Sequence, residues 1–163
     1  MNALLLESPF PDFDSISAEH VVPAIEAILK ANRSELASIK LGAEGADLVQ
    51  AFHALERLSA RLNDAWAPIA HLNAVMSHDA LRTAYNTCLP LLSAYETELG
   101  QDRDLLEIYE AIAAQQTALQ LSRAECKAVA NALRDFRLSG VALSDNDRKR
   151  YGELKQRLSR QTS

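Results

Sequence analysis

The sequence has few residues that interrupt helices and none of the long apolar runs that cross membranes. Its 163 residues include only five glycines and five prolines, and 48% of them are hydrophobic. A membrane-spanning helix needs about 20 consecutive apolar residues, whereas charged residues or prolines recur throughout this chain. The apolar run at residues 3–6 has no Lys or Arg before it and is interrupted by Glu7, unlike a signal peptide. These absences predict a soluble, cytoplasmic, helix-rich protein without a membrane partner.

Cysteine is equally scarce. Cys88 and Cys126 are the only two, too few for the disulfide framework of a small secreted domain. Each lies among apolar positions at helical spacing, so we expect two buried, reduced thiols. Neither sits in a context typical of a reactive thiolate. The sequence therefore offers no candidate thiol nucleophile.

The short motifs of common enzymes are also missing. The chain has no H-E-x-x-H zinc helix, no G-x-S-x-G nucleophile turn and no G-x-x-x-x-G-K phosphate loop. The histidines, none of which begins such a motif, are His20, His53, His71 and His78.

Two of these histidines, His71 and His78, lie seven residues apart. On one continuous helix this spacing is a rise of about 10.5 Å, too far for two ligands of one zinc ion. A loop between them could bring them together, with Asp79 as a third ligand. The alternative, which we favour, is that Ser77 caps a helix beginning at His78. We therefore predict no catalytic residue, no cofactor-binding residue and no metal ligand in this chain.

What the chain does contain is apolar residues at helical spacings of three and four over most of its length. The stripes that should face a core lie within residues 22–39, 48–69, 81–99, 105–112, 126–136 and 151–158. No alternating strand pattern of useful length occurs. The sequence predicts an all-α fold, an antiparallel helical bundle-like domain of about five or six helices, with residues 1–163 forming one domain.

Prolines, glycines and capping residues predict where these helices begin and end. Pro23 is tolerable only in or before the first turn of its helix, Pro68 should bend or end the second helix, and Pro90 should kink the third. Breaks are expected at Gly42, Gly45, Gly100 and Gly140, and caps at Asp102 or Asp104, at Ser122 with Glu125, and at Ser144 with Asp147.

The first 16 residues read as an extended lead-in to this helical body. Phe10, Phe13 and Ile16 recur every three residues. We expect these three side chains to pin the segment to the helices.

Charge is distributed unevenly along the chain. Residues 1–120 carry 7 basic and 17 acidic side chains, whereas residues 121–163 carry 10 basic and 5 acidic ones. Such asymmetry can indicate a nucleic-acid-binding tail, or two surfaces that meet each other or a missing partner. The basic residues of the last predicted helix, which avoid its Tyr151, Leu154 and Leu158 stripe, are Arg148, Lys149, Arg150, Lys155, Arg157 and Arg160.

This arrangement is typical of a solvated amphipathic helix. No aromatic residues are interleaved with the basic ones as on a base-stacking surface. We therefore predict no nucleic-acid partner.

Three stretches strongly resemble the N-terminal region of the thimet-type zinc oligopeptidases. They are "AEHVVPAIEAIL" (18–29), "PIAHLNAVMSHDALRTAYNTCLPLLSAYETELG" (68–100) and "KAVANALRDFRLSGVALSDNDRKRYGELKQRLS" (127–159). Their order and spacing also fit, so the resemblance covers nearly the whole chain. Long segments in one order are far more specific than a short motif.

The resemblance implies that the chain is one part of a much longer zinc metallopeptidase that hydrolyses short peptides. In that family the H-E-x-x-H helix and a glutamate zinc ligand lie far downstream of the matched region, which forms a wall of the substrate channel. The implied cofactor of the full-length enzyme is zinc, none of it bound by this chain. The implied partners are the missing catalytic domain of the same polypeptide and short peptide substrates.

The end of the sequence agrees with this expectation, because the last helical pattern runs into "RQTS" without a Gly or Pro stop. We expect an N-terminal fragment that is inactive alone. The alternatives are a free-standing helical module that binds another protein and, less favoured, a helical nucleic-acid-binding domain.

Overall fold

The computed structural model describes residues 2–6, 8, 10–42 and 47–161, apart from the side chains of residues 159–161. These residues form six α-helices and two short 3-10 turns, without a strand, so the predicted all-α class and number of helices are confirmed. The predicted break at Gly45 lies outside the described residues. The helices are α1 (Ala18–Gly42), α2 (Leu48–Val75), α3 (Asp79–Gly100), α4 (Arg103–Ala114), α5 (Arg123–Leu138) and α6 (Asp145–Gln161).

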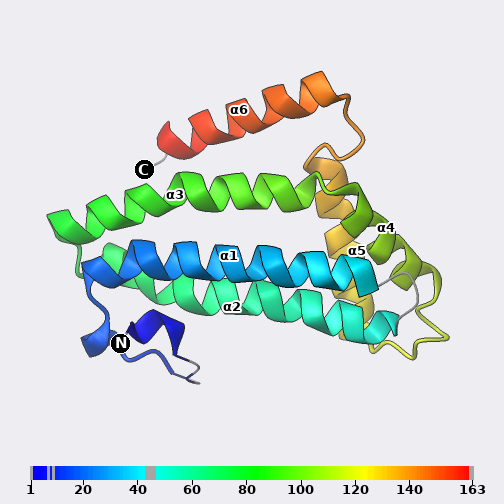
Figure 1. Ribbon diagram of the computed structural model, residues 1–163, viewed down its shortest axis with the longest axis horizontal. Coiled ribbons are helices and arrows are strands. Elements are labelled where there is room, and N and C mark those ends of the chain that lie inside the picture. Colours follow the sequence, from blue (N-terminus) through cyan, green and yellow to red (C-terminus); the bar gives the residue numbers. More distant parts are fainter. Residues whose placement is uncertain (1, 7, 9, 43–46, 162–163) are drawn as a thin grey trace.

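Three long helices form the body of the molecule (Figure 1). Helices α1, α2 and α3 lie side by side and alternate in direction, and α1 contacts both of the others. Helices α4 and α5 pack against one another at one end of this layer, while α6 runs along the far side of α3. None of the helices in the described part of the chain is long and apolar enough to cross a membrane.

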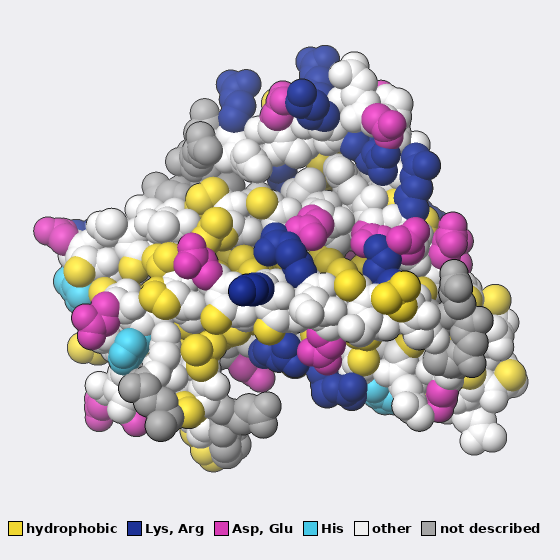
Figure 2. Space-filling view, viewed as in Figure 1, with side chains coloured by type: hydrophobic (Ala, Val, Ile, Leu, Met, Phe, Trp, Pro, Cys, Tyr) yellow, Lys and Arg dark blue, Asp and Glu magenta, His cyan; other side chains and the backbone are white. Residues whose placement is uncertain are grey.

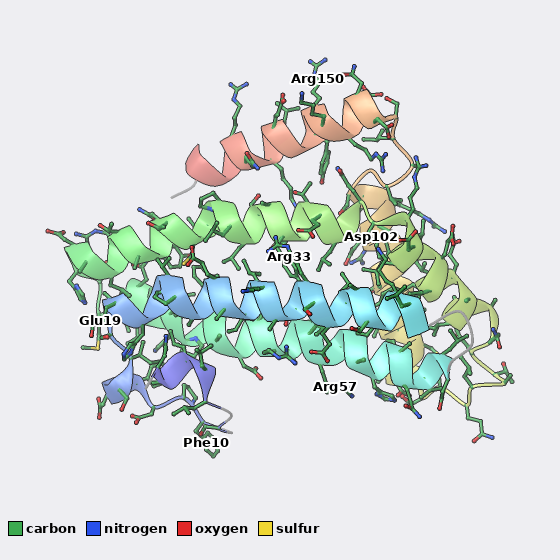
Figure 3. All side chains as sticks on the ribbon, viewed as in Figure 1. Phe10, Glu19, Arg33, Arg57, Asp102 and Arg150 are labelled. Carbon is green, nitrogen blue, oxygen red and sulfur yellow. The ribbon has the colours of Figure 1, made fainter. Side chains whose placement is uncertain are left out.

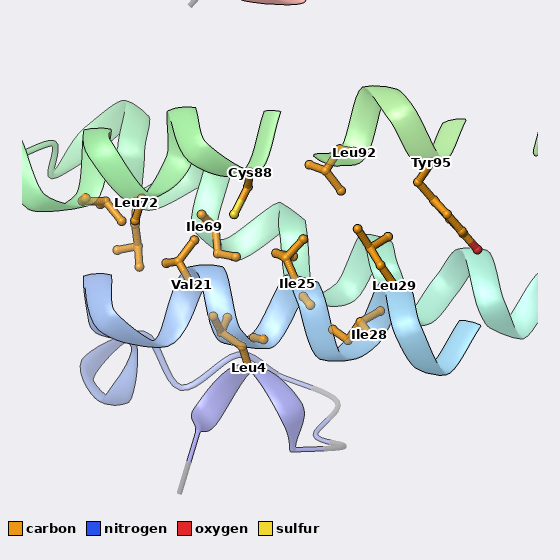
Figure 4. Packing of buried hydrophobic residues seen from close by; sticks show 14 residues of the cluster. Leu4, Val21, Ile25, Ile28, Leu29, Ile69, Leu72, Cys88, Leu92 and Tyr95 are labelled. Carbon is orange, nitrogen blue, oxygen red and sulfur yellow. The ribbon is translucent and has the colours of Figure 1, made fainter. Parts of the chain in front are cut away.

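A first hydrophobic cluster holds the three long helices together (Figure 4). Val21 and Ile25 of α1 and Ile69 of α2 are fully buried in it, and α3 adds Cys88 and Leu92. Fully burying one such aliphatic side chain stabilises a fold by about 1.5–3 kcal/mol. The apolar stripes predicted for the first three helices therefore meet in one core.

A second cluster fixes α4 and α5 to the end of α1 and α2. The whole predicted face of α4 is buried, namely Leu105, Ile108, Tyr109 and Ile112. The Tyr109 ring lies 5.7 Å from that of Phe136 in α5, tilted by 57°. Aromatic pairs favour tilted or offset arrangements over a face-to-face sandwich because of their ring quadrupoles.

The prolines interrupt the helices less than the sequence predicts. Pro23 lies in the second turn of α1, not in or before the first, and α2 continues through Pro68 to Val75. Helix α3 also continues through Pro90, and its two halves run in slightly different directions (Figure 1). A proline inside a helix loses a hydrogen bond and crowds the preceding turn. In α2 the burial of Pro68, together with that of Ile69 just after it, offsets this loss.

Three of the predicted helix caps are present. Asp102 accepts a hydrogen bond from the Leu105 amide at 3.0 Å. Ser122 and Glu125 form the complete capping box of α5, and Ser144 Oγ accepts from the Asp147 amide at 3.2 Å. Each cap satisfies a backbone donor that the first turn of a helix leaves without a partner.

The N-terminal lead-in differs from its prediction. It contains 3-10 turns at Ala3–Leu5 and Phe13–Ser15 rather than one extended run. Phe10 is 79% exposed and does not anchor it. Ile16 packs against the first cluster and the Phe13 ring lies 5.6 Å from that of His71, so these two predicted anchors are confirmed. Leu4, which is buried in the same cluster, and Asn2, whose amide nitrogen donates to the His20 carbonyl at 2.8 Å, are further anchors. The predicted three-residue repeat therefore fails only at Phe10.

Candidate functional site

The two histidines of the motif "HLNAVMSH" lie on opposite sides of a helix-helix turn. His71 is near the end of α2, where its ring lies 5.6 Å from that of Phe13. His78 is the N-cap of α3, and its Nδ1 accepts a hydrogen bond from the Leu81 amide at 3.4 Å. The predicted cap at Ser77 is therefore wrong by one residue, because the extended backbone of His78 turns its ring toward the first turn. Ser77 Oγ instead accepts from Arg82 at 3.0 Å.

The donor groups in this region do not fit a zinc ion. Within the described residues no three His, Cys, Asp or Glu side chains come together as a metal site requires. The Asp79 carboxylate is 98% exposed and pairs with Arg82. His20 and His53 have other partners, since His20 Nδ1 accepts from the Ser17 amide at 3.3 Å and His53 Nε2 lies 3.4 Å from a Glu125 oxygen.

The cysteines lie in different environments, and neither is in a disulfide. Cys88 is fully buried in the first cluster, and this burial raises the pKa of its thiol to about 11. The thiol is therefore protonated at neutral pH and is a poor nucleophile. Cys126 is only partly buried, in the first turn of α5, so the prediction of two buried thiols is wrong for it.

One buried polar residue that the sequence analysis missed joins α1 to α2. Asn32 is fully buried, and it donates to the Leu58 carbonyl at 3.0 Å and accepts from Arg61 at 3.1 Å. Arg61 also pairs with Glu35 at 2.8 Å. The signal was present, because Asn32 continues the core spacing of α1 between Leu29 and Leu36. All of these contacts are helix-to-helix hydrogen bonds and ion pairs, so their role is structural.

Two surface concavities lie on this scaffold. One, of about 590 Å³, lies where α2, α3 and α5 meet and includes Trp66 and Tyr95. The other, of about 1600 Å³, lies between the N-terminal segment and helices α1 and α2, with Arg57 and Asp64 in its lining. Asp12 and Ser15 also line the larger one, and the Ser15 hydroxyl donates to the Asp12 carboxylate at 2.6 Å.

The basic side chains of the C-terminal region lie along α6. Lys155 pairs with Glu96 of α3 at 3.4 Å, and Arg148 pairs with Asp145. The predicted inward stripe is wrong here, because Leu154 is 53% exposed and Leu158 is 60% exposed. The side chain of Arg160 lies outside the described residues. Ion pairs with acidic residues of this chain therefore neutralise only some of the described basic side chains of α6.

Comparison with known proteins identifies the family of this helical domain. Residues 25–148 match the family model described as "Neurolysin/Thimet oligopeptidase, N-terminal domain". The chain belongs to this family. The resemblance seen in the sequence is therefore confirmed.

Several oligopeptidases A are similar to this member of the family. The protein of Haemophilus influenzae is 40% identical over 158 residues, and that of Escherichia coli is 38% identical over 163. Both alignments cover 97% of this chain but only 23% of the relative. The "Probable cytosolic oligopeptidase A" of Arabidopsis thaliana is 32% identical, over 98% of the chain and 22% of its own length. The chain thus spans less than a quarter of these relatives and corresponds to the N-terminal domain of oligopeptidase A.

Proposed function

We propose that this chain is the non-catalytic N-terminal domain of a zinc oligopeptidase of the oligopeptidase A type. The proposal rests on a comparison between the aligned share of this chain and the aligned share of its relatives. Nearly all of this chain, 97%, aligns with only 23% of the Haemophilus influenzae protein, and the matching family model is that of an N-terminal domain. In this proposal zinc and the residues that cleave peptides belong to the remaining part of the polypeptide.

The domain's task in the proposal is to form one wall of the substrate channel. A wall must keep its shape when peptides press against it, and two hydrophobic clusters support the rigidity of this one. The buried Asn32 and its partner Arg61 add a specific lock between α1 and α2. A rigid wall excludes folded proteins by size and leaves short, unstructured peptides as substrates.

The cytoplasm is the proposed location. The name of one Arabidopsis thaliana relative includes the word cytosolic. Another relative from the same plant is named as organellar, chloroplastic or mitochondrial, so localisation of the tagged protein in its own cells is the direct test.

A chimera tests the proposed activity. This chain replaces the matching segment of the Haemophilus influenzae oligopeptidase A, and a quenched fluorescent peptide reports hydrolysis. We expect the chimera to cleave the peptide and the isolated chain with added zinc to leave it intact. Chelator-sensitive cleavage by the isolated chain would contradict the proposal.

The wall is tested by substrate size. The chimera is compared with the same relative lacking its N-terminal segment, on a short peptide and on a folded protein. We expect the chimera to cleave only the peptide. If the truncated enzyme also cleaves the peptide and leaves the folded protein intact, the proposed role of this domain as a channel wall is contradicted.

A further inference from the structure

Helix α6 turns a polar face toward the rest of the domain. The side chains that are partly buried recur at helical spacing, and they are Arg148, Tyr151, Gly152, Lys155 and Gln156. Gly152 lies close to α3, since a β-carbon there would lie 3.7 Å from the Thr97 methyl group. No described side chain of α6 is buried. The helix is thus held on one side, by contacts that remove little apolar surface from water.

The opposite face of α6 combines positive charge with an exposed leucine. Lys149, Arg150 and Arg157 are exposed and make no ion pair with any described residue. Leu154 lies beside them and is 53% exposed. Figure 2 shows Lys and Arg side chains gathered along the edge of the molecule that α6 forms, and Figure 3 shows Arg150 pointing away from the body. We name Lys149, Arg150, Leu154 and Arg157 the outer face of α6.

This face has the composition of an interface rather than of a purely solvated helix. Its arginines can form bidentate pairs with carboxylates, and Leu154 gains stability only if something covers it. The acidic surplus of residues 1–120 does not neutralise it, since the ion pair from α6 to the body is Lys155 with Glu96, on the opposite face. An acidic surface from outside the described residues would pair with these cations and cover Leu154.

We propose that the outer face of α6 is an interface with the remainder of the same polypeptide, which meets it with an acidic surface. This inference rests on the proposed function. The relatives are more than four times as long as the matched segment, since it covers 23% of their length. The added chain must pack on this domain somewhere, and the outer face of α6 offers both unpaired cations and apolar area for it.

Nucleic acid is the other class of partner that a basic helix attracts, and the observations disfavour it. Tyr151, the aromatic residue of α6, lies on the inner side and is not available for base stacking. An acidic protein surface tolerates the leucine, whereas a phosphate backbone gains nothing from it.

Amide hydrogen exchange tests the proposed interface, because it reports on individual residues of α6. Exchange of the α6 amides is measured in the isolated chain and in the Haemophilus influenzae chimera described above. The test variant is the double substitution Arg150→Glu with Arg157→Glu. The matched control is Lys127→Glu, which reverses an exposed charge in α5.

We expect the α6 amides to exchange about tenfold more slowly in the chimera than in the isolated chain, because exchange follows local opening. The double charge reversal should abolish that extra protection and leave exchange in the isolated chain unchanged, and the control should retain it. Equal exchange in the two proteins, or equal effects of the test and control variants, would overturn the inference.

A separate measurement decides between the partner classes. The isolated chain is mixed at low salt with a fluorescently labelled 20-nucleotide DNA duplex, and no binding is expected. Salt-sensitive binding that Arg150→Glu with Arg157→Glu removes would overturn the inference in favour of nucleic acid. An inactive wild-type chimera would instead count against the proposed function, while an active chimera with an unprotected α6 would count against the interface alone.

Discussion

Helices α1 and α6 show how differently two amphipathic patterns of one chain can be used. Helix α1 buries seven side chains and contacts two neighbouring helices along its length. Helix α6 buries no described side chain and packs mainly on α3. Both patterns predict an inward apolar stripe, but only α1 has helices on either side to cover it. A stripe indicates which face prefers burial, and the neighbours determine whether that face is buried.

The largest effect should come from the core of α1. Ile25→Ala removes a fully buried side chain from the first cluster and should lower the free energy of unfolding by about 2–5 kcal/mol. Urea denaturation followed by circular dichroism measures this. A loss well below that range would mean that α1 is held no more firmly than α6.

A second effect should come from the buried polar contact of α1. Asn32→Ala removes the hydrogen bond to the Leu58 carbonyl and the one from Arg61, which keeps its ion pair with Glu35, and removing the partner of a buried polar group costs about 1–3 kcal/mol. The control is Asn63→Ala, at an exposed position in α2. The same denaturation experiment should separate the two variants, and equal stabilities would show that the Asn32 contact is not needed.

The third comparison uses matched helix caps. Ser122 caps α5, whose Val129 and Phe136 are buried, and Ser144 caps α6. Ser122→Ala should destabilise the whole domain by about 0.5–2 kcal/mol. Ser144→Ala should change global stability less and mainly speed amide exchange within α6, because α6 can open without disturbing either core. A global loss as large as that of Ser122→Ala would show that α6 is part of the cooperative unit.

The smallest effect should come from the exposed leucine of α6. Leu154→Ala in the isolated chain should change the free energy of unfolding by no more than about 0.5 kcal/mol, as expected for a surface substitution. Alanine also favours helix slightly more than leucine. Thermal denaturation of Leu154→Ala and Ile25→Ala under the same conditions compares the two helices directly. A decrease of the free energy of unfolding by more than about 1.5 kcal/mol for Leu154→Ala, as is typical of a buried leucine, would show that Leu154 lies in a core.

Much of the fold, and the family, could be predicted because the sequence patterns that indicate them are local or run continuously along the chain. Helical periodicity repeats within each segment, and the cap at Ser122 depends on residues three positions apart. The long stretches of family resemblance gave the same assignment that the family model confirms. The spacing of His71 and His78 argued against a shared metal ion only on one continuous helix, whereas His71 lies in α2 and His78 caps α3.

The sequence by itself determined which segments are helical, where most of them begin and which family they belong to, since these depend on neighbouring residues. Only the tertiary structure decided that α2 continues through Pro68, that His78 rather than Ser77 caps α3, and that Leu154 of α6 is mostly exposed. Each of these depends on contacts between distant segments, which can outweigh a local preference of a few kcal/mol or leave it unsatisfied.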